Sequence, residues 1–173
     1  MEKIIDPMLS VPPFSLGFPD GNNQSNYYPG QERITKDDIA VVAKVMEKLS
    51  IEPENTRVRK IIHGTKPTFE ILQASAEPAT IINQLDGYGL EPTIRVKRGD
   101  HAAEMSRICS ALMEAVKFAA SDNQAALLFD YIESFRTGSL QAYRKSQKRW
   151  VTDLSPRVEN ILGFVDLTEI LTA

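Results

Sequence analysis

Three neighbouring side chains, Asp100, His101 and Glu104, are of the types that could bind a metal ion or transfer protons. Carboxylates and imidazoles bind divalent ions and act as acids and bases near neutral pH. The same pattern is also typical of a helix start, with Asp100 as the N-cap and His101 exposed in the first turn. Because Gly99 directly precedes this group, we favour the helix start and expect no catalytic residue here.

The sequence offers few other ligands or nucleophiles, with two histidines and one cysteine. Cys109 falls on an apolar helical stripe, which predicts a small buried side chain rather than a nucleophile. His63 precedes a hairpin glycine, so a strand-end role is favoured over metal binding. Histidine pairs with the spacing of a zinc peptidase and CxxC pairs are both absent from the sequence. We therefore predict no metal ligand and no cofactor in this chain.

A basic run near the carboxyl end could bind RNA through charge and stacking, or could be a solvated helix face. Its members are Arg144, Lys145, Lys148 and Arg149, flanked by Tyr143 and Trp150. The chain has 20 Lys and Arg against 23 Asp and Glu, for a net charge of −3. This balance gives no general attraction for nucleic acid, so we favour the solvated face.

The first half of the chain should contain one helix and a small antiparallel sheet. Thr35 and Asp38 have capping-box spacing, and Ile34 with Ile39 could form a hydrophobic staple, so a helix should begin there and end before Pro53. Residues 56–63, 68–73 and 93–97 are typical of strands, the first two joined as a hairpin through residues 64–67. Residues 78–85 are expected to form a turn of helix.

The second half should be helical. A buried stripe runs from Met105 to Ala119, and Ser121 can cap a second helix with an apolar face through Phe135. Gly138 should kink this helix, which then resumes as far as Trp150. Together these elements predict an α+β fold with a small antiparallel sheet and three substantial helices.

Residues 1–33 are interrupted by prolines, glycines and asparagines every few positions, which predicts an irregular lead-in arm. No apolar run reaches 18 residues, so we expect no membrane partner. A single cysteine excludes an intramolecular disulfide and fits a reducing compartment, so we expect the chain in the cytoplasm.

Several separated motifs resemble one known family. YIESFRTGS at residues 131–139 is followed by Trp150, Asp153, Pro156 and then Val158-Glu159. This order resembles the dipeptidyl peptidase III family of zinc exopeptidases, in which YIESF-x-x-GS precedes W-x-x-D-x-x-P-x-VE. Residues 96–102 (VKRGDHA), 27–30 (YYPG) and 55–57 (NTR) are similar to further landmarks in the same order. The resemblance runs from Phe18 to Phe164.

The resemblance implies two lobes that face a wide cleft, one carrying zinc and the other built around a small β-barrel. Residues 34–164 would belong to the barrel-bearing lobe, and residues 165–173 form a divergent tail. The family's zinc motifs, HExxxH and an EExRA-type sequence, lie downstream of Phe164 in the family and are absent here. The chain is therefore expected to be a fragment that is inactive alone. Zinc and oligopeptide substrates belong to the complete, cytosolic enzyme.

One functional residue follows from the resemblance. Glu159 matches a family glutamate that holds the free amino terminus of the substrate. A tyrosine that assists at the scissile carbonyl in some members aligns with Ile161, which has no hydroxyl. The alternative is a non-catalytic peptide-binding or interaction module that associates with the missing lobe or with an intact homologue. Whether the same locus encodes HExxxH downstream discriminates between the two hypotheses.

Overall fold

The computed structural model describes residues 27–63, 66–77, 81–84 and 93–163 of the 173-residue chain. These residues form two compact units. The first contains the described residues up to Leu72 and those within Ile82–Val96. The second contains the described residues within Gln73–Ile81 and Lys97–Phe164. The expected lead-in arm lies mostly outside the described residues, and the expected tail lies wholly outside them.

Helix α2 (Lys36–Lys48) begins at the predicted capping box. The Thr35 hydroxyl accepts a hydrogen bond from the backbone N–H of Asp38, and the Asp38 carboxylate accepts one from the N–H of Thr35. This reciprocal pair satisfies two amide groups that a helix start leaves without partners. The helix ends at Lys48 with Leu49 as its C-cap, ahead of the short 3-10 helix η1 (Pro53–Asn55).

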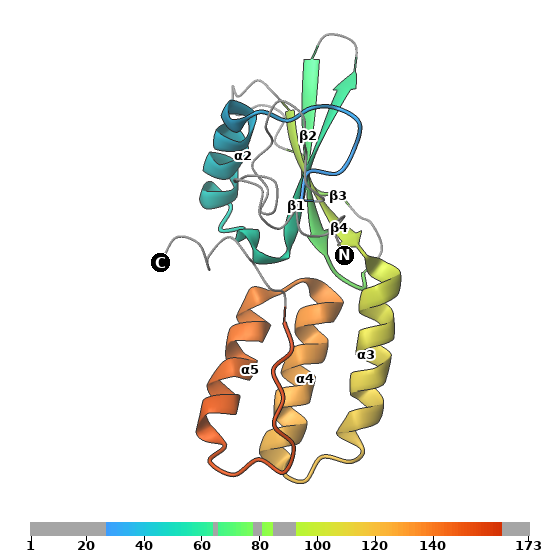
Figure 1. Ribbon diagram of the computed structural model, residues 1–173, viewed down its shortest axis with the longest axis vertical. Coiled ribbons are helices and arrows are strands. Elements are labelled where there is room, and N and C mark those ends of the chain that lie inside the picture. The colour runs from blue at the N-terminus through green and yellow to red at the C-terminus, as the bar shows by residue number, and fades with distance from the viewer. Residues whose placement is uncertain (1–26, 64–65, 78–80, 85–92, 164–173) are drawn as a thin grey trace, which may run out of the picture. The chain divides into compact units, whose positions relative to one another are not determined.

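Four strands follow, and Figure 1 shows them beside α2. They are β1 (Thr56–His63), β2 (Lys66–Ala74), β3 (Ile81–Gln84) and β4 (Thr93–Asp100), in the spatial order β1-β2-β4-β3. The two-residue connection between the neighbours β1 and β2 makes them an antiparallel hairpin. The N–H of Ser75, just after β2, donates to the carbonyl of Asp100 at the end of β4 (3.2 Å), so β2 and β4 run parallel.

These elements confirm the α+β prediction, with a mixed sheet where the sequence indicated only antiparallel pairing. The prediction of a helical turn within residues 78–85 was wrong, because residues 81–84 form strand β3 at the edge of the sheet. A segment of four residues has too short a pattern to distinguish the two periods, and pairing with β4 decides its conformation.

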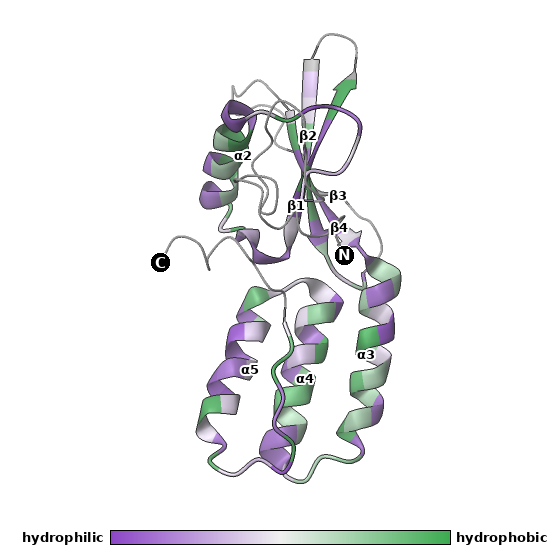
Figure 2. Ribbon diagram, viewed as in Figure 1, coloured by the Kyte–Doolittle hydropathy of each residue, from purple (hydrophilic) through white to green (hydrophobic). Residues whose placement is uncertain are grey.

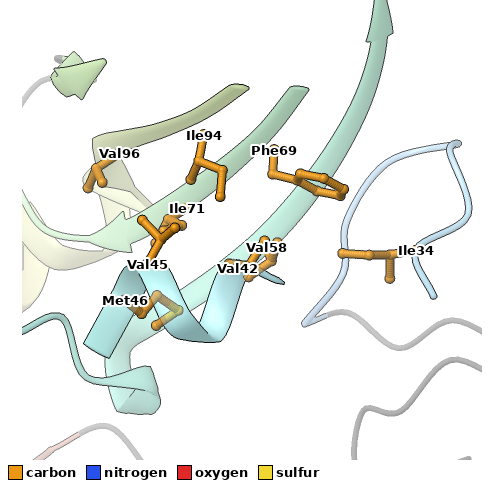
Figure 3. Close-up of a cluster of buried hydrophobic side chains, with 9 residues drawn as sticks. All are labelled: Ile34, Val42, Val45, Met46, Val58, Phe69, Ile71, Ile94 and Val96. Carbon is orange, nitrogen blue, oxygen red and sulfur yellow. The ribbon is translucent and has the colours of Figure 1, made fainter. Parts of the chain in front are cut away.

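The core of the first unit lies between α2 and the sheet. Figure 3 shows Val42, Val45 and Met46 of α2 directed toward side chains of the strands. The buried cluster consists of Ile34, Val42, Val45, Met46, Val58, Phe69, Ile71, Ile94 and Val96. Alternate residues of β4 fit this arrangement, since Ile94 and Val96 are buried while Arg95 and Lys97 are partly exposed. The predicted alternation of this strand is therefore confirmed.

Ion pairs tie charged strand residues to their neighbours in this unit. The guanidinium of Arg59 on β1 binds the carboxylate of Glu70 on β2, whose side chain is only 3% exposed. Lys60 Nζ lies 2.7 Å from Asp38 Oδ2. Burial alone would raise the pKa of Asp38, but its bonds with Lys60 and Thr35 outweigh burial and lower that pKa. These contacts join β1 to β2 and to α2.

The second unit contains three helices that lie side by side in Figure 1: α3 (Ala102–Val116), α4 (Asp122–Thr137) and α5 (Leu140–Thr152). Figure 2 shows that α5 is mostly hydrophilic, with hydrophobic positions near its ends. The core comes mainly from α4 and comprises Leu112, Leu127, Leu128, Tyr131, Ile132 and Phe135. Met105, Ile108, Cys109, Val116, Tyr143 and Trp150 pack around it, half-buried.

Gly138 ends α4 rather than kinking it. Its φ of 76° is left-handed, its N–H donates to the carbonyl of Ser134 (2.8 Å), and Ser139 then caps a separate helix. The described residues thus contain four α-helices, one more than predicted. The stop is fixed by packing as well as by φ, because an added Cβ on Gly138 would lie 3.0 Å from the carbonyl oxygen of Ala74.

Replacing Gly138 by alanine should destabilise the protein by about 1–2 kcal/mol, the usual cost of a left-handed L-residue, and by more if Ala74 cannot move. Thermal unfolding followed by circular dichroism measures this loss. Ala142→Gly, on the first turn of α5, is a useful comparison because it makes the reverse substitution, alanine to glycine, at a position with ordinary helical φ. An unchanged midpoint for Gly138→Ala would contradict the close approach to β2.

Among the helices of the described ranges, none combines the length and the apolar character needed to cross a lipid bilayer.

Candidate functional site

The group around His101 lies where β4 ends and α3 begins. Asp100 ends β4 instead of capping α3, and the N-cap position is taken by His101 with a left-handed φ of 54° and no side-chain cap bond. The prediction that Asp100 is the N-cap was therefore wrong, because β4 continues three residues beyond Lys97, where the predicted strand ended. His101 Nδ1 lies 4.0 Å from Glu104 Oε2, and both side chains are about half exposed.

The two remaining chemical candidates are a strand-end histidine and a helix cysteine. His63 is the last residue of β1, as its position before the hairpin predicted, and its side chain lies outside the described residues. Cys109 is half-buried against the helical core, and its Sγ lies 3.7 Å from the carbonyl oxygen of Ile132. Burial raises the pKa of this thiol, with Arg136 opposing the shift, so little of the nucleophilic thiolate forms at neutral pH.

Two of the four cations in the basic run bind an acidic residue of the neighbouring helix. Asp130 on α4 is buried, and its carboxylate lies 2.9 Å from Lys145 Nζ and 2.5 Å from Arg149 Nε. A carboxylate without such partners would be costly to bury. Lys145 and Arg149 thus join α4 to α5. Two cations of the run that could have bound RNA therefore have a structural role.

Glu159 lies in the extended segment that follows α5. Figure 1 shows this segment running back along α4 and α5. The Glu159 side chain is exposed, and its Oε1 accepts a hydrogen bond from the indole Nε1–H of Trp150. Ile161, two residues later, is 63% exposed. The predicted ligand for an amino terminus is therefore at the surface of this unit, where a peptide could reach it.

The segment that carries Glu159 is anchored on its carboxyl side. The backbone N–H of Leu162 donates to the hydroxyl of Tyr131 (3.2 Å), which also accepts from Gln147 Nε2 (3.2 Å). Gly163 lies so close to the ring of Tyr143 that an added Cβ would be 2.7 Å from a ring carbon. The buried face of the helices thus holds the segment in place through its tyrosines.

Sequence reasoning missed the roles of Trp150 and Tyr131. Apart from their places in the family motifs, Trp150 was predicted to be a possible stacking residue at the end of a helix, and Tyr131 to be part of an apolar face. The motif W-x-x-D-x-x-P-x-VE contained both Trp150 and Glu159, but spacing alone gives no contact between a helix end and an extended segment. A tyrosine in an otherwise apolar stripe was the one available signal, because a buried hydroxyl needs a hydrogen-bond partner.

A metal site in a protein needs several ligand side chains close together. No three histidine, cysteine, aspartate or glutamate side chains among them come together in an arrangement that could hold a metal ion. The zinc that the resemblance implies for the complete enzyme therefore does not fit the residues described here.

The chain is similar to the metallopeptidases that its motifs suggested. The sequence model described as "Peptidase family M49" matches residues 1–168, so the chain belongs to that family. It is 38% identical over 149 residues to dipeptidyl peptidase 3 of Dictyostelium discoideum, covering 85% of this chain and 20% of that protein. It is 29% identical over 150 residues to human dipeptidyl peptidase 3, covering 82% and 20%. Dipeptidyl peptidase 3 of Nematostella vectensis is 28% identical over 165 residues, covering 87% and 22%.

The chain thus spans about a fifth of the length of these curated relatives. The family membership confirms the resemblance seen in the sequence. The role of Glu159 is not tested by these similarities and stays a prediction.

Proposed function

We propose that this chain is the part of a cytosolic dipeptidyl peptidase that binds the free amino terminus of an oligopeptide. The observation that carries the proposal is the exposed Glu159 carboxylate on an anchored segment, in a chain of family M49. A carboxylate forms a charge-assisted hydrogen bond with a peptide ammonium group. The cytoplasm is supported by the single cysteine, which needs no oxidising compartment.

Peptide cleavage then requires residues beyond this chain. The sequence contains no HExxxH motif. A catalytic zinc usually takes three protein ligands, and the two histidines of this chain do not have the spacing of a zinc-binding pair. We therefore assign to this chain the binding of substrate and no catalytic step. Its partners are the oligopeptide and the zinc-bearing part of the enzyme.

The purified chain should contain no stoichiometric zinc and should not hydrolyse dipeptidyl arylamides. Elemental analysis and a fluorogenic release assay test the two expectations. The matched preparation is the same chain extended with the downstream part of a dipeptidyl peptidase 3 relative, which should bind zinc and release dipeptides. One tight zinc per unextended chain, or turnover that survives repurification and is abolished by a chelator, would refute the proposal.

A second candidate function is a non-catalytic peptide-binding or interaction module, with an intact homologue as partner. It is favoured by Ile161, which is exposed and has no hydroxyl where the resemblance places a tyrosine. An extended chain that binds peptides and zinc but turns over only after Ile161→Tyr would support this second candidate.

A further inference from the structure

Most serine and threonine hydroxyls in the described part of the chain are buried or already bonded. Several accept the N–H groups at helix starts or donate to helix carbonyls, among them Thr35, Ser110, Ser121, Thr137, Ser139 and Thr152. Ser155 differs from these. It is exposed, and no hydrogen bond within the described ranges involves its hydroxyl, although its backbone N–H donates to Asp153 Oδ1 (3.4 Å).

The backbone around Ser155 is also free of regular structure. Residues 153–163, which follow α5, form neither helix nor strand. The side chains of Leu154 and Val158 are 96% and 59% exposed, so this stretch is not packed down by its apolar residues. Such a stretch can enter the active-site cleft of another enzyme, whereas a helical serine keeps its backbone bonded within the helix. Ser155 is therefore placed to act as the acceptor in a group transfer.

The residue after this hydroxyl is a proline. Of the ten prolines in the sequence, Pro156 is the single one that follows a serine or threonine. Proline has no backbone N–H, and it favours an extended conformation for the residue before it. A kinase whose cleft leaves that N–H position without an acceptor selects proline there, because any other residue would bury an unpaired donor. The pair Ser155-Pro156 has the chemistry that such an enzyme recognises.

We propose that Ser155 is a phosphorylation site for proline-directed protein kinases, and that the phosphate loosens the last turn of α5. The Ser155 Oγ attacks the γ-phosphorus of ATP, so a bond forms between Oγ and phosphorus. The bond from this phosphorus to the oxygen that bridges the β- and γ-phosphates breaks, and ADP leaves with that oxygen. The hydroxyl proton passes to the catalytic aspartate of the kinase. The inference is independent of the role of Glu159.

The effect on α5 follows from charge. A phosphoserine carries about −1.5 to −2 charges at neutral pH. Ser155 lies two residues beyond Asp153, the C-cap of α5, whose N–H closes the last turn by donating to the carbonyl of Trp150 (3.2 Å). The C-terminal end of a helix is its negative end, and Asp153 adds a carboxylate there. A phosphate at Ser155 therefore adds like charge to this end of the helix.

The first test incubates the whole chain with ATP, Mg²⁺ and a cyclin-dependent kinase, an enzyme of the proline-directed class. Mass spectrometry should find one phosphate per chain, located on Ser155 and absent from Ser155→Ala. Pro156→Ala restores the N–H, so the rate at limiting substrate should fall by about 5- to 150-fold. Ser106→Ala is the matched control, because Ser106 is an exposed serine of α3 that is followed by arginine, and its loss should change nothing.

The other outcomes of this test overturn the site. They are no incorporation of phosphate, incorporation that persists in Ser155→Ala, and a rate that Pro156→Ala leaves unchanged. Circular dichroism of each variant shows that the helices are intact, so a lost phosphate cannot be attributed to unfolding.

The second test compares amide exchange in the phosphorylated and unphosphorylated chains. The Asp153 amide should exchange about 2- to 5-fold faster after phosphorylation, the range for one charge near a helix terminus. Amides in the middle of α4 serve as the internal control and should not change. Treatment with a phosphatase should restore the original rate at Asp153. An unchanged Asp153 rate, or an equal acceleration throughout α4, would overturn the local effect on α5.

Discussion

Glu159→Gln should weaken the binding of peptides with a free amino terminus by about 10- to 150-fold, as expected for about 1.5–3 kcal/mol from a hydrogen bond to a charged group. The substitution removes the negative charge to which the proposed function assigns the substrate ammonium. It retains an oxygen that can accept the Trp150 N–H, so the anchored segment should keep its conformation. Affinity is measured by calorimetry on the chain extended with the downstream part of a relative, because the Glu159 carboxylate is exposed to water in this chain.

Peptides with acetylated amino termini provide the control for this prediction. They have no ammonium group, so their affinity should hardly change on Glu159→Gln. The ratio of the two affinities therefore isolates the charge contact from any effect on folding. An equal loss for both peptides would show that Glu159 supports the loop and does not bind the amino terminus.

The parts of the fold that could be predicted are those determined by residues close together in the sequence. The capping box of Thr35 and Asp38 fixes the start of α2 through contacts within one turn. Strand β1 has the predicted bounds. Its run of residues with high strand propensity lies between a turn and a glycine, and these two breakers set the ends of the strand. The Ser121 cap of α4 was found in the same way, and its hydroxyl accepts from the N–H of Gln124.

The parts that could not be predicted depend on contacts distant in sequence. Gly138 is compatible with either a kink or a stop, and its stop is reinforced by residues far back in the chain: Gln73 Nε2 donates to its carbonyl, and Ala74 leaves no room for a Cβ. The end of α4 is bonded similarly, with the N–H groups of Ala76 and Glu77 donating to its last carbonyls. No local pattern reveals such partners.

In the candidate site, too, the sequence indicated the residue type but not the contacts between distant segments. Glu159 was identified by resemblance, because a motif preserves residue type and order. Its hydrogen bond with Trp150 and the bond from Leu162 to Tyr131 join separate elements, and each depends on how α4 and α5 pack. The sequence thus predicted the charged group, and the structure added what holds it.

Truncation of Tyr131 should have the largest effect on stability. Its ring is fully buried in the helical core and lies 6.4 Å from the ring of Tyr143, centroid to centroid. Tyr131→Ala removes that packing and leaves a cavity, which should cost about 3–5 kcal/mol by comparison with other large aromatic truncations. For a chain of this size, the unfolding midpoint should fall by about 6–20 °C.

Tyr131→Phe separates the ring from the hydroxyl. Phenylalanine keeps the packing and loses only the acceptor for Leu162 and Gln147, so its cost should be about 0.5–1.5 kcal/mol. Thermal unfolding by circular dichroism compares the two variants, and amide exchange at Leu162 reports the anchor directly. In Tyr131→Phe the Leu162 amide should exchange faster while the amides in the middle of α4 stay protected. Equal losses of stability in the two variants would show that the hydroxyl, and not the buried ring, is what Tyr131 contributes to this unit.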